Sequence, residues 1–110
     1  MQRNILIDGK EIPFKATAST PRRYRQLFGK DIIVDMQSLS DASQKGEYKV
    51  DDLEAFENIA YTMAKQADES IPDVDEWLDG FDMFSIYTIL PQIIDLWGVN
   101  QKTIEKSKKA

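Results

Sequence analysis

The pair Asp8-Gly9 constrains the fold of this 110-residue chain more than any other feature of its sequence. A two-residue loop of this kind predicts a β-hairpin over residues 3–15, because a type I′ turn needs positive φ at both central positions. The register that follows places four apolar side chains on one face: Ile5, Ile7, Ile12 and Phe14. A lone hairpin is only marginally stable in water, so we expect other parts of the chain or another chain to cover this face or its free edge.

The rest of the sequence predicts helices. Start and stop signals predict one helix from Ser19-Thr20-Pro21 to Gly29 and a second short helix over 31–42, followed by a polar loop over 43–49. Helical spacing of apolar residues predicts a longer amphipathic helix over 50–68. A short acidic helix, capped by Asp73, is expected between Pro72 and Gly80. The last predicted helix spans residues 81–97, and Pro91 is expected to kink it near Tyr87.

Together these signals predict a mainly α, small helical domain of about four to five helices with an N-terminal β-hairpin. The predicted domain covers residues 1–100, with the hairpin at 3–15 and helices from about 20 to 97, and residues 101–110 form a flexible cationic tail. No signal-peptide pattern and no long uninterrupted apolar segment occur, so we expect neither secretion nor a membrane span. The absence of cysteine fits a reducing cytoplasm.

The composition excludes several kinds of chemistry. The chain has no cysteine and no histidine, which rules out disulfides, serine–histidine triads and zinc sites built on those residues. No glycine-rich phosphate-binding loop is present. The acidic stretch "DVDEWLDG" does not match a calcium-binding EF-hand loop, because Trp77 and Leu78 occupy positions that require ligands or glycine. We therefore expect no catalytic residues, no metal and no cofactor.

Charge is distributed unevenly along the chain. Residues 1–30 carry seven Lys/Arg against two Asp/Glu, whereas residues 31–104 carry four against sixteen. This asymmetry favours association with a charged partner or head-to-tail self-association.

The stretch "STPRRYRQLFGKD" contains four cations that are candidates for partner binding, here called the basic cluster: Arg22, Arg23, Arg25 and Lys30. A helix here is expected to bury Tyr24, Leu27 and Phe28 and to present its arginines to acidic protein surface. Nucleic-acid binding is the alternative, which the acidic chain (pI ≈ 4.7) disfavours.

The predicted helix over 81–97 is apolar on most sides. A helix of this kind is either central in the core or shared with a partner. We expect part of it to form an interface, and the candidate partner-binding residues, here called the C-terminal apolar set, are Trp77, Phe81, Phe84, Tyr87, Leu90, Ile94 and Trp97.

Four stretches of the sequence together resemble a known family. They are the hairpin "I-DG-KEI-FKAT", then "STPRRYRQLFGKDII-DM", "AYTMAKQAD" and "EWLDGFDMFSIYTILPQIIDLW". Over roughly residues 3–100 the chain resembles the tail assembly chaperones of long, non-contractile-tailed phages and prophages of Gram-positive bacteria.

The resemblance implies a small helical protein of the host cytoplasm that is absent from the finished virion. Such chaperones bind the tape measure protein, keep it soluble and help to recruit tail tube subunits. A programmed ribosomal frameshift typically gives a longer second product, which would contact the tail tube protein. Two other functions remain open: a nucleic-acid-binding phage regulator that uses the basic cluster, and a virion head–tail connector.

Overall fold

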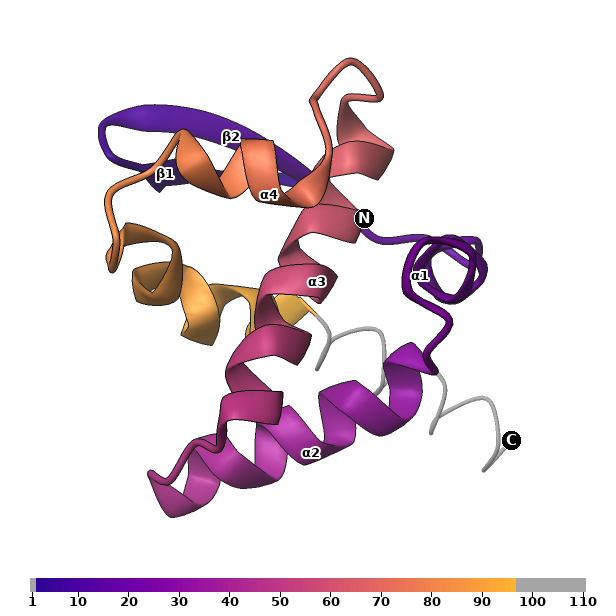
Figure 1. The fold of residues 1–110 in the computed structure, drawn as a ribbon, viewed down its shortest axis with the longest axis vertical. Coiled ribbons are helices and arrows are strands. Elements are labelled where there is room, and N and C mark those ends of the chain that lie inside the picture. Colours follow the sequence, from indigo (N-terminus) through magenta and orange to yellow (C-terminus); the bar gives the residue numbers. More distant parts are fainter. Residues whose placement is uncertain (1, 97–110) are drawn as a thin grey trace.

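The computed structural model describes residues 2–96 of the chain. Two strands come first, followed by helices (Figure 1). The elements are β1 (Gln2–Ile7), β2 (Lys10–Lys15), α1 (Thr20–Phe28), α2 (Ile32–Lys45), α3 (Val50–Ala67), α4 (Val74–Asp79) and the 3₁₀ helix η1 (Ser85–Ile89). Residues 90–96 are also helical. The expected class, a mainly helical domain with an N-terminal β-hairpin, is confirmed.

The hairpin forms with the predicted turn and register. Asp8 and Gly9 have φ angles of 52° and 76°, which are the positive values that a type I′ turn requires. Ile5 pairs with Ile12 across the two antiparallel strands. The predicted apolar face is turned to the core, where Ile5, Ile7 and Phe14 are buried and Ile12 is half-buried.

Helix α3 is the central element of the domain. Figure 1 shows it running through the middle of the molecule, with α2 across its N-terminal end and α1 to one side. Strand β2 and helices α1, α2 and α4 all contact it. The amphipathic pattern predicted one apolar face, but α3 is buried over more of its surface than that. Polar side chains such as Asn58, Thr62 and Gln66 are buried along with Phe56 and Ile59.

Helices α1 and α2 begin at the predicted positions, with one difference in detail. Asp31 caps α2 by accepting a hydrogen bond from the Ile33 N–H at 2.8 Å. Ser19 precedes α1 as expected, but its hydroxyl makes no capping hydrogen bond. It accepts instead from the Arg23 guanidinium at 3.2 Å.

Helix α2 is longer than predicted. It continues to Lys45, so the expected polar loop over 43–49 begins one turn later, at Gly46. Gly46 has a φ of 71° and ends the helix in the left-handed conformation, which glycine adopts without steric cost.

The expected continuous helix over 81–97 is wrong. Residues 81–84 are not helical, residues 85–89 form η1, and the α-helical part begins at Leu90. The reason lies in Pro91, which has no N–H and whose ring would collide with the carbonyl of Tyr87 inside an α-helix. Proline fits the first turn of a helix, so the α-helix starts just before it, at Leu90, and the kink expected within a continuous helix does not occur.

Trp97 and the predicted cationic tail at 101–110 lie outside the described residues. Within residues 2–96, no helix combines the length and apolar character that crossing a membrane would require.

Candidate protein-binding groove

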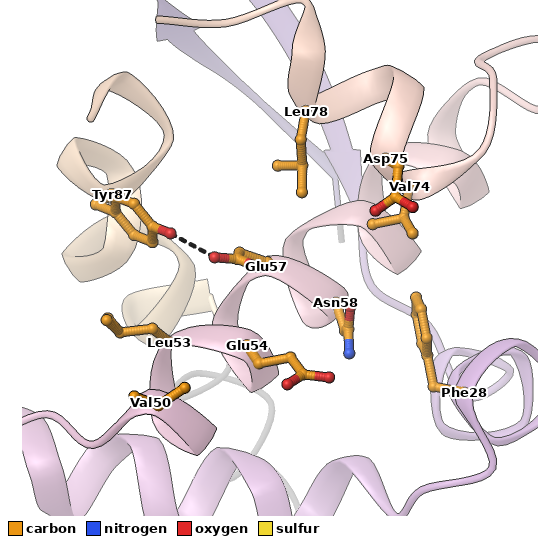
Figure 2. Close-up of a pocket in the computed structure, with 10 residues that line it drawn as sticks. All are labelled: Phe28, Val50, Leu53, Glu54, Glu57, Asn58, Val74, Asp75, Leu78 and Tyr87. Atoms are coloured by element: carbon orange, nitrogen blue, oxygen red, sulfur yellow. Dashed lines mark hydrogen bonds between the residues drawn. The ribbon is translucent and has the colours of Figure 1, made fainter. Parts of the chain in front are cut away.

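An opening on the described surface lies beside α3 and beneath α4 (Figure 2). We call it the α3–α4 groove. Its volume is about 500 Å³. Ten residues line it: Phe28, Val50, Leu53, Glu54, Glu57, Asn58, Val74, Asp75, Leu78 and Tyr87.

One face of α3 supplies half of these residues. Val50, Leu53, Glu54, Glu57 and Asn58 follow the spacing i, i+3, i+4, i+7, i+8, which places them side by side along one stripe of a helix. The stripe begins with two apolar side chains, Val50 and Leu53, and continues with the carboxylates of Glu54 and Glu57, so the groove has an apolar surface with negative charge beside it.

Helix α4 forms the opposite wall. Figure 2 shows Val74 and Leu78 reaching from α4 toward the α3 side chains, with the carboxylate of Asp75 at the edge. The first turn of the helix is stabilised by its N-cap, because the Asp73 carboxylate accepts from the Glu76 N–H at 2.9 Å. Trp77, on the other side of α4, is buried in the core and anchors the wall.

Phe28 and Tyr87 close the two sides of the groove, and ring contacts fix both. The Phe28 ring lies 5.4 Å from the ring of Tyr24 and 6.4 Å from that of Tyr61. The Tyr87 ring lies 6.0 Å from Phe56. Its hydroxyl donates a hydrogen bond to the Glu57 carboxylate (Figure 2), and this bond together with burial raises the pKa of Tyr87 to about 12. The walls are therefore ordered before any partner arrives.

Asn58 gives the groove a polar group on its floor. The residue is 8% exposed, and its side-chain amide has no hydrogen-bond partner among residues 2–96. No fully buried side-chain nitrogen or oxygen in that range lacks a partner, so this amide reaches the surface of the groove. Its amide points into the space between α3 and Phe28 in Figure 2. An amide offers both donors and an acceptor, so it is available to a bound segment.

The structure divides the C-terminal apolar set between core and surface. Trp77 and Leu90 are buried, so neither is free to contact a partner. Phe81, Tyr87 and Ile94 are half-buried against the core, and Phe84 is 72% exposed. Trp97 lies outside the described residues. Only Tyr87 of this set lines the α3–α4 groove.

The basic cluster lies on and just after α1. Arg22, Arg25 and Lys30 are exposed. Arg23 forms an ion pair with Glu69 at 3.3 Å, which matches the expectation that an arginine of this cluster meets the acidic part of the chain. Tyr24 is buried and Phe28 half-buried, as expected, but the prediction for Leu27 was wrong. Leu27 is 47% exposed, because the face of α1 toward α3 and α2 is occupied by Tyr24 and Phe28.

Most residues of the groove were not predicted as a site. The side chains come from four separate segments, and only folding brings them together. One signal was present in the sequence: the stripe of Val50, Leu53, Glu54 and Glu57 has helical spacing and mixes apolar with acidic residues. A helix that buries several faces leaves such a stripe at the edge of the core.

Two further hollows occur on the described surface. One, of about 500 Å³, is lined mainly by polar residues of α2 and the start of α3, such as Asp41, Lys45 and Asp52. The other, of about 310 Å³, lies between α1 and α3 beside Arg23 and Leu27. Among the described residues, no group of acidic side chains is arranged to hold a metal ion.

Comparison of the chain with models of known protein families, with curated proteins and with solved structures gives no match.

Proposed function

We propose that this chain is a phage tail assembly chaperone. In this role it binds the tape measure protein in the cytoplasm of the bacterial host, keeps that protein soluble and helps to recruit tail tube subunits. It acts by binding, without catalysing a reaction, and is not part of the finished virion. The sequence resemblance over residues 3–100 supports the family, and the domain has the small, mainly helical character that the resemblance implies.

The observation that carries the proposal is the α3–α4 groove. A long client helix has an apolar stripe that aggregates when it is left exposed. Such a stripe is protected when it lies against an apolar groove between helices. Val50, Leu53 and Leu78 offer apolar surface of this kind, and the ring contacts of Phe28 and Tyr87 hold the groove in shape. A preformed groove lowers the entropy cost of binding.

Co-expression with the tape measure protein tests the proposal. The two proteins are produced together, the chaperone is captured through an affinity tag, and the eluate is examined by native mass spectrometry. We expect a soluble complex with several copies of this chain per client. A client that stays insoluble while this chain elutes alone would contradict the proposal.

The two competing functions predict different results. A head–tail connector would be found in purified phage particles, where a chaperone is missing. A nucleic-acid-binding regulator would bind DNA or RNA with a steep dependence on salt concentration, because its contacts to phosphates release counterions.

A further inference from the structure

We infer that the α3–α4 groove binds a cationic amphipathic helix, so that the client segment held there carries Lys or Arg beside its apolar stripe. The inference rests on the proposed chaperone function, and it adds the chemistry of the bound segment and the surface that holds it.

The charge of the groove carries the inference. Its ten lining residues include three carboxylates, Glu54, Glu57 and Asp75, and no Lys or Arg. Glu54 and Asp75 are exposed, and neither has a hydrogen bond or ion pair within residues 2–96. Negative potential beside an apolar surface attracts a segment that carries positive charge and repels an acidic one.

The carboxylates flank the apolar surface in a way that suits a helix. Glu54 belongs to α3 and Asp75 to α4, so the two acids approach the groove from opposite walls, as Figure 2 shows. An amphipathic helix lying between the walls would place its apolar stripe against Leu53, Val74 and Leu78. Its basic residues would flank that stripe and face the two acids. The unpaired Asn58 amide on the floor would hydrogen-bond to a polar group of the helix.

A second copy of this chain fits the groove less well. Its basic region is α1, and the only large apolar side chain that α1 exposes is Leu27. One leucine does not fill a space of about 500 Å³. The occupant should present several apolar side chains at helical spacing, as a long amphipathic client helix does.

Two designed peptides test the inference. Both are helical, with the same leucine stripe; one carries lysines beside the stripe and the other carries glutamates. Binding to the intact chain is measured by fluorescence anisotropy. We expect the cationic peptide to bind at least about tenfold more tightly than the acidic one, and its affinity to fall as salt is added. Equal affinities would overturn the inference.

Matched charge-reversal variants locate the binding surface. The groove variant is E54K/D75K, and its control is D79K/D95K, which changes the net charge equally at two exposed acids outside the groove. We expect the groove variant to bind the cationic peptide at least about tenfold more weakly than the parent chain does. The control should change binding much less. Equal losses in the two variants would show that only overall charge matters, and would overturn the inference.

A second pair of variants tests the apolar part of the groove. Val50 is 79% exposed at the groove, and Val34 is 62% exposed on α2, away from it. Val50→Asn should lower the affinity for the cationic peptide severalfold, whereas Val34→Asn should leave that affinity unchanged. Because both side chains are exposed, neither change should unfold the domain. No effect of Val50→Asn would place the peptide elsewhere and overturn the inference.

Co-expression of the groove variant with the tape measure protein separates this inference from the proposed function. If the parent chain keeps the client soluble and E54K/D75K does so equally well, the chaperone function stands and the groove assignment fails. If the parent chain also fails, the function itself is wrong. If E54K/D75K only dissociates a complex of this chain with itself, and the cationic peptide does not bind, the occupant is a second copy and the inference is overturned.

Discussion

A small network of buried and partly buried hydrogen bonds joins the start of α1 to the end of α3. The Thr20 hydroxyl donates to the Gln66 side-chain oxygen at 2.6 Å, and the Gln66 amide donates to the Thr17 hydroxyl at 2.6 Å. Thr20 and Gln66 are 3% and 9% exposed. A buried polar group that loses its partner is not compensated by water, so this network should contribute measurably to stability.

Replacement of Gln66 tests this contribution. Gln66→Leu leaves the Thr20 hydroxyl without its acceptor and should lower the free energy of unfolding by ~1–3 kcal/mol. Urea denaturation followed by circular dichroism measures the change. The control is Gln26→Leu, because Gln26 is exposed on α1, and its effect should stay within about 0.5 kcal/mol. Similar stabilities for the two variants would show that the network contributes little.

Two tyrosines make the stability of the domain sensitive to high pH. Burial, together with a hydrogen bond to Asp35, raises the pKa of Tyr24 above its ordinary value of 10.0, and the bond to Glu57 raises the pKa of Tyr87 to about 12. The unfolded chain then releases protons from these groups at a lower pH than the folded chain does. The contribution to stability is complete below pH 10 and is lost as pH rises toward and beyond 12.

Denaturation at a series of pH values tests the assignment. The parent chain should lose stability steadily from about pH 10 to 12. A Tyr24→Phe, Tyr87→Phe double variant should lose it less steeply over the same range, because phenylalanine does not ionise. Parallel pH profiles for the two proteins would contradict these assignments.

The hairpin and the helices differ in how far the sequence predicts them. The hairpin follows from local rules, since the Asp8-Gly9 turn sets the register of both strands. Helix starts at residues 19–21 and at Asp31 were also predictable from nearby residues. The helix over 81–97 was not, because its composition favours a helix throughout while Pro91 determines where the α-helix can begin. The groove depends on contacts between α1, α3, α4 and η1, which no local pattern reveals.

The turn of the hairpin also has a role in tertiary structure. The Asp8 carboxylate accepts from the Asp82 N–H at 3.0 Å, and so ties the turn to the segment that leads into η1. Hydrogen bonds from the Ser85 side chain and from the Asp82 backbone lower the pKa of Asp8 below its usual value. The turn geometry therefore affects the packing of β1 against η1.

Substitution of Gly9 tests the importance of the turn. Nothing lies within 4 Å of a Cβ placed there, so the cost of a side chain comes from the positive φ alone. Gly9→Val should lower the free energy of unfolding by ~1–2 kcal/mol, because β-branched residues avoid the left-handed region. Gly9→Asn should cost less, since asparagine adopts that region more readily. Equal losses for both variants, measured by urea denaturation, would contradict this account of the turn.

Positive charge is concentrated in residues 1–30 of the chain and negative charge in residues 31–104. The basic cluster on α1 and the carboxylates of the groove lie in different regions, and only Arg23 forms an ion pair among the described residues. Exposed pairs of this kind contribute little to folding, so most of these charges are available to partners. We expect them to orient the chain on its client or relative to neighbouring copies.

Charge reversal in the basic cluster tests its role in assembly. R22E/R25E spares Arg23 and its ion pair, and the control K10E/K45E makes the same change in net charge at two other exposed lysines. The first variant should form smaller complexes with the client in sedimentation velocity, without loss of thermal stability. Complexes of parental size would show that the basic cluster has no part in assembly.

The most direct test of the chaperone function is the aggregation of the tape measure protein itself. The client is diluted from denaturant, and light scattering is followed over time with and without an excess of this chain. The proposed function predicts that scattering is suppressed in proportion to the amount of chain added. Scattering that rises equally in its presence and absence would contradict the claim that this domain protects a long helical client.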